Sequence, residues 1–535
     1  MACRQPSVLS NLCIETIADH MRSDFAIGNL ESVSAADDRN CECPFDWMLG
    51  EHLTKLFDAL CKKRKICESH LPLLLSKKVK VLNLSGCPLL HTKHDRYSYT
   101  FRSHYPRKIA ENDQLITTVS AAHMNISSLS LQNLEAISCS VLCGLFASLP
   151  RLTSLDVSGS KVNDKVVESI ATHCQQLEDL NLDLCDISDC GLGFICLPKH
   201  YGNKNLIAAS LKRLSISLNV NVTVDGVFMV LKLLPQLVYF DHSYWQEVFI
   251  AIKASYPPVE ENHENCDPVI KTMKRMQALK MNIGLSTQEI QDAIKSGLIK
   301  FVCTTCPYLK ELFLGYCMYN QVLLNLVSLR HLESLSLGGE LDRHHDLYQH
   351  GITTVLQEIG SNLKELVLHD IVTDLHLIGK CCPNLKRFFM ATLDHDEEIV
   401  IQHWSHIVPS TPVFMETEVI ELSTEEGGLL QDTCCFEALF GNHNNKLKKA
   451  VIKQHPVTIS DEQINMCIDQ GKFYSLEELI LHGKFNLKSI KRLAKSPYSF
   501  LQYLELEQHC HQRNVRLELD KIVQEIKPRL VLKWV

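Results

Sequence analysis

The chain has 535 residues, 45% of them hydrophobic and 22% charged, so it can bury a large core and is not a disordered polymer. Its formal net charge of −8 excludes the basic excess of a general nucleic-acid-binding protein. Its 23 cysteines are spread over a long chain, which excludes a small secreted domain held together by disulfides.

The first predicted element is a helix close to Met1. Its apolar residues recur at three- and four-residue spacing and so form one helical face. They are Leu9, Leu12, Cys13, Ile17 and Met21. The same stretch contains acidic residues and no uninterrupted apolar core, so it does not have the pattern of a secretory signal. No run of 18 apolar residues occurs anywhere, and we expect no membrane-spanning segment.

A polar segment over 22–42 is predicted to be a loop, and a second helix follows it. The apolar stripe of that helix consists of Leu49, Leu53, Leu56, Phe57 and Leu60. The basic run 62–65 is interpreted as the charged end of this helix. Residues 1–78 contain no repeated phrase, and their simplest interpretation is a helical cap on the array that begins at Val79.

From Val79 onward one phrase recurs: an apolar residue, two others, an apolar residue, one other, and an apolar residue. Its first copy consists of Val79, Leu82 and Leu84. Further copies begin at Ile126, Leu152, Leu177, Leu211, Leu237, Met276, Leu309, Leu332, Leu363, Leu385, Leu447, Leu476 and Leu501. The alternation predicts a short strand with one buried face, and the stretch before the next copy is helical in pattern. One unit cannot bury its apolar face alone, so the units are expected to stack over 79–535.

Three inserts interrupt this array. Residues 97–108 are basic and aromatic, and residues 245–274 contain two adjacent prolines and an acidic run, which indicates a longer connection. Residues 392–445 are rich in proline and glycine, and we expect a degenerate repeat inside them at 419–422. The predicted organisation is therefore one long array behind a short helical segment.

Cysteines recur at fixed positions of several copies of the phrase. The stretches Cys174–Cys185, Cys306–Cys317 and Cys382–Leu385 resemble the cysteine-containing subclass of leucine-rich repeats. The resemblance implies an α/β fold, a leucine-rich-repeat solenoid with a curved parallel sheet and outer helices. It also places most cysteines at turns or helix ends as free thiols, which favours a reducing compartment, the cytoplasm or the nucleus.

The N-terminal helices carry a second resemblance. The spacing of Leu9, Cys13 and Ile17 resembles the elongin-binding box of the von Hippel–Lindau type, and the second helix resembles the accompanying cullin-2 box. The second helix also resembles the start of an F-box, although Leu49 is followed by Gly50 where both families have proline. The choice of cullin therefore stays open. The residues implied to bind an adaptor are Leu9, Leu12, Cys13, Ile17, Leu49, Leu53, Leu56 and Phe57.

Motifs for catalysis, metal binding or cofactor binding are not found. The chain lacks a nucleophile elbow, a phosphate-binding loop and a dinucleotide fingerprint. The one CxxC pair, Cys303 and Cys306, has no second pair at zinc-finger spacing and is interpreted as core packing. No grouping of Cys, His and an acid singles out a nucleophile. We therefore expect no metal, no cofactor and no enzymatic activity.

The residues between and beside the apolar positions of each strand are expected to point outward. Many are acidic and some are aromatic, which suits a basic or mixed protein segment, although exposed sheet positions can also be polar for solubility alone. The predicted substrate contacts are Asp156, Asp179, Asp183, Tyr239, Asp241, Glu311, Phe313 and Phe389.

The resulting functional hypothesis is a non-catalytic substrate-recognition subunit of a cullin-RING ubiquitin ligase. Its helices would bind elongin B/C, and its repeats would bind a target protein. The alternatives are an F-box receptor of a Skp and cullin-1 ligase, and a leucine-rich scaffold unrelated to ubiquitin. Neither a membrane nor a nucleic acid is expected as a partner.

Overall fold

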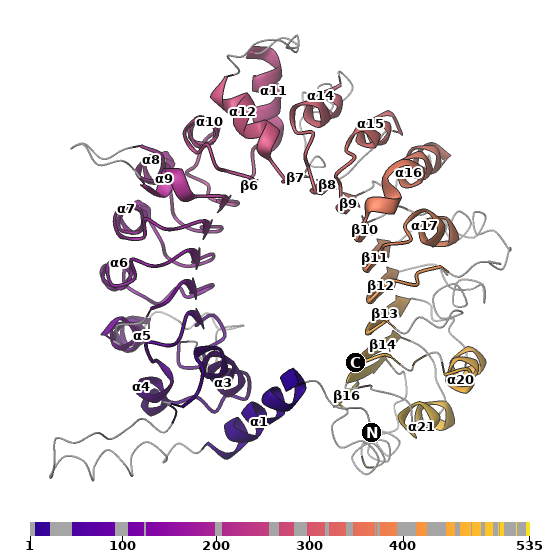
Figure 1. The fold of residues 1–535 in the computed structure, drawn as a ribbon, viewed down its shortest axis with the longest axis horizontal. Helices are drawn as coiled ribbons and strands as arrows, with labels where there is room; N and C mark the ends of the chain where they lie inside the picture. Colours follow the sequence, from indigo (N-terminus) through magenta and orange to yellow (C-terminus); the bar gives the residue numbers. More distant parts are fainter. Residues whose placement is uncertain are drawn as a thin grey trace. The chain divides into compact units, whose positions relative to one another are not determined.

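The computed structural model describes residues 6–21, 45, 47–90, 105–121, 125–197, 206–255, 267–282, 297–315, 320–338, 346–369, 371, 375–392, 413–424, 446–454, 461–471, 473, 475–482, 487–495, 501, 503–507, 521 and 531–534. The chain divides into two compact units. The first comprises Met1–Val248 with Glu260–Met276, and the second comprises Phe249–Val259 with Gln277–Val535. Each unit is a stack of strand–helix repeats (Figure 1).

Among its described residues, the first unit begins with four short helical elements, which we call the N-terminal box. They are α1 (Pro6–His20), α3 (Gly50–Lys62), η2 (Glu68–His70) and α4 (Leu71–Leu74). Leu53, Leu56, Phe57 and Leu60 of α3 are buried, and α1 packs against α3. The side chains that α1 buries are Ile14, Ala18 and Met21, which lie at helical spacing on one face.

In the part of the first unit that the structure describes, six parallel strands follow the box. They are β1 (Val81–Asn83), β2 (Ser128–Ser130), β3 (Ser154–Asp156), β4 (Asp179–Asn181), β5 (Arg213–Ser215) and β6 (Tyr239–Asp241). Each strand pairs with the next in register, so the central apolar residue of every repeat forms one buried column. The column consists of Leu82, Leu129, Leu155, Leu180, Leu214 and Phe240.

The helices of the first unit lie on one side of its strands (Figure 1). They are α5 (Tyr105–Ala121), α6 (Cys139–Ala147), α7 (Asp164–His173), α8 (Asp189–Cys196), α9 (Leu206–Ser210), α10 (Val224–Leu233) and α12 (Pro268–Arg275). Side-chain oxygens of Ser138, Asn163 and Ser188 cap the starts of α6, α7 and α8. Helix α11 (Trp245–Ser255) contains the residue at which the chain passes from one unit to the other.

Carboxylates at the helix starts join one repeat to the next. Asp164 accepts hydrogen bonds from the backbone N–H and the hydroxyl of Ser188, at 2.8 and 2.6 Å. One repeat later, Asp189 accepts the equivalent pair from Thr223, at 2.9 and 2.6 Å. A Cβ at Gly191 would lie 2.4 Å from the Asp164 carboxylate, so glycine is required there for the carboxylate to approach.

The described residues of the second unit include ten parallel strands. They are β7 (Ala278–Asn282), β8 (Glu311–Gly315), β9 (Ser334–Gly338), β10 (Glu365–His369), β11 (Arg387–Thr392), β12 (Val419–Thr424), β13 (Lys449–Gln454), β14 (Glu478–His482), β15 (Tyr503–Glu507) and β16 (Val531–Trp534). Its helical elements are α14 (Leu298–Thr305), α15 (Asn320–Asn325), η3 (Leu326–Ser328), α16 (Asp346–Ile359), η4 (Gly360–Asn362), α17 (Leu375–Cys381), α20 (Asp461–Asp469) and α21 (Leu487–Lys495).

The strands of the second unit are longer, and each contains two apolar positions that align in two buried columns. The first runs from Leu279 through Leu312 and onward, and the second runs from Met281 through Leu314. Both continue in register from strand to strand as far as Leu532 and Trp534. The leucines of β8, β9 and β10 in these columns are 3% exposed or less, so the repeats share one continuous core.

The repeat prediction is confirmed for every copy, since each predicted phrase contains one of the strands β1–β11 or β13–β15. The degenerate repeat expected at 419–422 is β12, which pairs with both neighbours. Strand β16 was not predicted. The connection expected over 245–274 is helical at both ends, through α11 and α12, and residues 256–266 lie outside the described residues. Of the insert at 97–108, only 105–108 are described, at the start of α5.

Within the described part of the chain, every helix is too short or too polar to cross a membrane.

Candidate functional site

The outward side of α1 carries the predicted adaptor cysteine. Cys13 is exposed and Ile17 is half-buried, whereas Ile14 and Ala18 on the adjoining side of the helix are buried. Leu9 and Leu12 lie on the same helix, but their side chains are outside the described residues. One face of the helix therefore packs against the protein's own core, and Cys13 remains accessible to another molecule.

Three lysines that follow or lie on α3 bind α1. The Lys63 ammonium pairs with Glu15 at 2.7 Å and with Asp19 at 2.8 Å. Lys65 also reaches Asp19, at 3.2 Å, and Lys55 donates to the Asn11 side chain at 3.2 Å. Each of these contacts lies on the α3-facing side of α1. Together they fix the orientation of the helix without involving Cys13.

The ion pairs shift the titration of their members. Hydrogen bonds from Lys63, and then from Lys65, hold the pKa of Asp19 below its ordinary value. The same contact with Asp19, followed by that with Glu15, raises the pKa of Lys63. Both shifts favour the charged forms, so the contact between α1 and α3 is in place across the neutral pH range.

The second predicted adaptor helix is arranged differently. Leu53, Leu56 and Phe57 are 1%, 0% and 2% exposed and belong to the protein's own core, so a partner has no access to them in this structure. Leu49, predicted as a member of the helical stripe, is the residue before the helix and is 59% exposed. Sequence periodicity identified the apolar face but could not tell whether the face meets the protein or a partner.

One exposed aromatic residue lies beside this helix start and was not singled out by the sequence. Trp47 is 74% exposed, two residues before Leu49. An exposed tryptophan and leucine before α3 form an apolar spot on the surface of the box. No periodicity marks Trp47, because it lies in a turn and outside both helical stripes.

The predicted acidic strip of the first unit is partly used inside the fold. Asp183 accepts hydrogen bonds from the Ser215 hydroxyl at 2.7 Å and the Ser217 backbone at 2.6 Å, both in the next repeat. Asp241 is 6% exposed and accepts from the Ser217 hydroxyl at 3.0 Å. Asp156 accepts from Ser158 two residues later, at 2.7 Å. These carboxylates stabilise turns, which limits their contribution to a binding surface.

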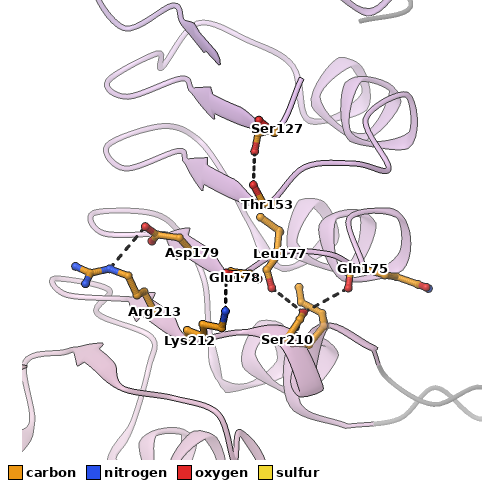
Figure 2. Close-up of polar contacts among 10 residues, drawn as sticks. Ser127, Thr153, Gln175, Leu177, Glu178, Asp179, Ser210, Lys212 and Arg213 are labelled. Atoms are coloured by element: carbon orange, nitrogen blue, oxygen red, sulfur yellow. Dashed lines mark hydrogen bonds and ion pairs between the residues drawn. The ribbon is translucent and has the colours of Figure 1, made fainter. Parts of the chain in front are cut away.

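A cation compensates another part of the strip (Figure 2). Arg213 lies 3.6 Å from Asp179 and stacks over the ring of Tyr239, with 4.2 Å from its guanidinium carbon to the ring centre. Partial burial raises the pKa of Asp179, and Arg213 opposes that rise. Lys212 pairs with Glu178 at 2.8 Å just before the two strands. The structure thus brings Asp179 and Tyr239 together around one arginine.

In the second unit, charges of both signs alternate along the residues at the starts of neighbouring strands. Glu333 pairs with Lys364 at 2.5 Å, Glu365 with Arg387 at 3.1 Å, and Glu418 with Lys448 at 2.8 Å. All of these side chains except that of Lys448 line a groove of about 400 Å³ over the starts of β8–β12. The other lining residues are Lys310, Glu311, Ser334, Lys386 and Val419.

The remaining predicted substrate contacts lie in or close to this groove. Glu311 is exposed at the start of β8 and lines the groove, while Phe313 is half-buried on the same strand. Phe389 is half-buried on β11, with its ring centre 5.1 Å from that of His369 on β10. The ion pairs make the groove of the second unit close to neutral, whereas the sequence suggested a strip with an excess of acidic residues.

Many of the described cysteines of the repeats are buried packing residues, whereas Cys190 is exposed. Cys174 is buried, and its thiol lies 3.6 Å from the Phe146 carbonyl in the preceding repeat. Burial raises the pKa of Cys174 to about 12 and likewise that of Cys303 to about 12, so both are protonated thiols at neutral pH. The described residues contain no group of three or more His, Cys, Asp or Glu placed to hold a metal ion. Cys317 lies outside them.

Comparison with known proteins agrees with the repeat geometry. A leucine-rich-repeat family model matches residues 173–196, the repeat that contains β4 and α8. This is the stretch whose cysteines and leucines gave the clearest copy of the repeated phrase.

Three solved structures are similar at low identity. The yeast Rad7 and Elc1 complex matches with 15% identity and a TM-score of 0.36, over 98% of this chain and 87% of that one. An internalin from Listeria monocytogenes matches with 12% identity and a TM-score of 0.31, over 79% and 88%. A TLR13 complex with single-stranded RNA matches with 16% identity and a TM-score of 0.35, over 74% and 50%. Scores of this size carry no argument about partners.

The parallel strands in register, the helices on one side and the matched repeat together determine the architecture. It is an α/β leucine-rich-repeat solenoid.

Proposed function

We propose that this protein is a non-catalytic substrate receptor of a cullin-RING ubiquitin ligase, with α1 as its adaptor-binding helix. The observation that carries the proposal is the exposed Cys13 on a helix whose opposite face is anchored in the protein's own core. The resemblance of Leu9, Cys13 and Ile17 to the elongin-binding box implies that this face enters a pocket on elongin C.

The two helices of the box have different proposed roles. Helix α3 closes the end of the repeat array, since its apolar stripe is buried and Gly50 lies against the Lys78 backbone. Helix α1 rests on α3 and presents Cys13 outward. The interpretation of the box as a cap therefore applies to α3 and leaves α1 available for docking.

The same geometry gives less support to the F-box alternative. That alternative places adaptor contacts on the second helix, whose Leu53, Leu56 and Phe57 are inside the protein. Binding a Skp adaptor through them would require α3 to leave its core. Elongin B/C is therefore the proposed adaptor, the repeats are the proposed substrate platform, and ubiquitin transfer is catalysed by the recruited ligase through proximity.

Coexpression tests the proposal directly. The full chain is coexpressed with tagged elongin B/C and, in parallel, with tagged Skp, and each adaptor is purified. We expect elongin B/C to retain the chain and the variant Cys13→Arg to be lost from the complex. Cys190→Arg is the matched control, because Cys190 is also an exposed helical cysteine but lies on α8.

Two results would contradict the proposal. One is failure of the folded wild-type chain to bind elongin B/C, and recovery with Skp instead would move the assignment to the F-box class. The other is equal retention of Cys13→Arg and Cys190→Arg, which would show that the exposed face of α1 has no role in docking.

A further inference from the structure

The turn after each of the strands β2–β5 contains one residue with a left-handed backbone. These residues occupy the same repeat position, the sixth when the first residue of the strand is counted as one. They are Asn133 (φ 59°), Gly159 (φ 66°), Leu184 (φ 53°) and Leu218 (φ 61°). Glycine and asparagine adopt this conformation readily, whereas leucine does so only at a cost in free energy.

The repeat needs this conformation but does not need leucine. The left-handed residue donates its backbone N–H to the next repeat: Gly159 to the Asp183 carbonyl at 2.8 Å, and Leu184 to the Ser217 carbonyl at 2.9 Å. A backbone bond of this kind is available to any residue, and the glycine and asparagine of the two preceding repeats make it without strain. The leucine side chains are therefore not explained by the turn.

Burial does not explain them either. Leu184 is 57% exposed and Leu218 is 63% exposed, and Val220 beside them is 86% exposed. Since β4 pairs with β5, the two leucines belong to neighbouring repeats. We call Leu184, Leu218 and Val220 the leucine ridge. It combines backbone strain with exposed apolar surface, and neither feature stabilises the fold.

The ridge is bordered by negative charge. Asp186 occupies the repeat position of Val220 one repeat earlier and is exposed. Its carboxylate accepts one hydrogen bond from the neutral Asn221 amide at 3.2 Å, and the described residues give it no ion pair. Asp183, next to Leu184, has its carboxylate hydrogen-bonded to uncharged groups of Ser215 and Ser217. The cation in the equivalent position, Lys161, lies one further repeat away.

We propose that the leucine ridge binds an extended segment of another protein that presents apolar side chains next to a lysine or arginine. An extended chain advances about 3.4 Å per residue and neighbouring strands lie about 4.8 Å apart, so two residues of a segment that crosses the repeats span the distance between adjacent repeats. Such a segment can contact both leucines with its apolar side chains, and its cation is attracted by Asp186. This binding does not depend on adaptor docking at α1, so either can fail while the other holds.

The test uses the full chain and a phage-displayed library of random peptides as the probe. Peptides selected on the wild-type chain are titrated against it and against the double variant Leu184→Asn with Leu218→Asn. Asparagine suits the left-handed turn, so the double variant should melt at the wild-type temperature or above it. We expect selected peptides to pair apolar residues with lysine or arginine and to bind the double variant at least tenfold more weakly.

Leu197→Asn is the matched control, because Leu197 is a 48% exposed leucine of the same unit that lies outside the ridge. It should leave peptide binding unchanged, and Asp186→Lys should weaken the basic peptides selectively. Failure to enrich any peptide, or equal binding by the double variant, would overturn the proposal. Light scattering that shows wild-type self-association abolished by the double variant would also overturn it, by making a second copy the occupant.

Discussion

Helices α1 and α3 carry apolar residues at similar spacing, yet they use them in opposite ways. In α3 the apolar stripe that includes Leu53 and Leu56 is sealed inside the protein. In α1 the buried face is Ile14 and Ala18, while Cys13 remains exposed. An apolar stripe thus does not reveal which surface it will meet. The difference is decided by the elements available to cover it, and α3 lies between α1 and the first repeat.

The largest expected difference between the two helices is in the free energy of unfolding that is lost when an apolar side chain is truncated. Leu56→Ala removes a fully buried side chain of α3 and should lower the free energy of unfolding by about 2–5 kcal/mol. Cys13→Ala on α1 removes an exposed thiol and should change it by less than about 0.5 kcal/mol. Urea denaturation of both variants measures this contrast. Equal effects would mean that the helices are not distinguished as described.

The next largest effect concerns the close contact between the start of α3 and the backbone just before the first strand. A Cβ at Gly50 would lie 1.9 Å from the Lys78 carbonyl oxygen, so Gly50→Ala forces backbone apart and should cost about 1–3 kcal/mol. Gly86→Ala is the control, because no atom lies within 4 Å of a Cβ there. Thermal unfolding should show a lower melting temperature for the first variant alone. An unchanged temperature for Gly50→Ala would argue against the close approach.

A smaller effect is expected for the contact that holds α1. Lys63→Met removes the pairs with Glu15 and Asp19 but leaves the α3 core intact. We expect faster amide hydrogen exchange in α1, with exchange in α3 unchanged. Lys62→Met is a neighbouring control on an exposed lysine of the same helix end. Equal exchange in α1 for both variants would show that its position does not depend on Lys63.

The smallest effect is the pH dependence of this contact. The pKa of Asp19 is lowered in the folded protein, so its contribution is complete above the ordinary aspartate pKa of about 4 and is lost as the pH falls through the lowered value. The pKa of Lys63 is raised, so its contribution is lost only as the pH rises above about 10.4. Protease cleavage of α1 should therefore be constant from about pH 5 to 9. A change inside that window would point to other groups.

The repeats were predictable because their signal is periodic and local. Each L-x-L phrase places two leucines on one face of a strand, and stacking requires the same face in every copy. Strand β16 was not predicted because the first apolar position of the phrase, three residues before Leu532, is occupied by Arg529. The helices α11 and α12 were not predicted because two adjacent prolines and an acidic run, which indicate a connection, lie between them.

The site was less predictable than the fold because exposure depends on neighbours that are distant in sequence. Asp183 has the outward position of a binding residue, but Ser215 and Ser217 of the next repeat occupy its carboxylate. Leucines such as Leu184 and Leu218 would be assigned to the core from sequence alone, but both lie in left-handed turns and are exposed. The outward position of Asp183 does not reveal that its carboxylate is occupied, since that depends on two serines of the adjoining repeat.

Amide hydrogen exchange of the full chain, alone and with elongin B/C, tests the central claim most directly. The account predicts that α3 is protected in both states, and that α1 exchanges faster in the free chain and becomes protected when the adaptor is added. Cys13→Arg should abolish the added protection in α1 and leave α3 as it was. The account is contradicted if the adaptor leaves α1 unchanged, or if the new protection appears in α3 instead.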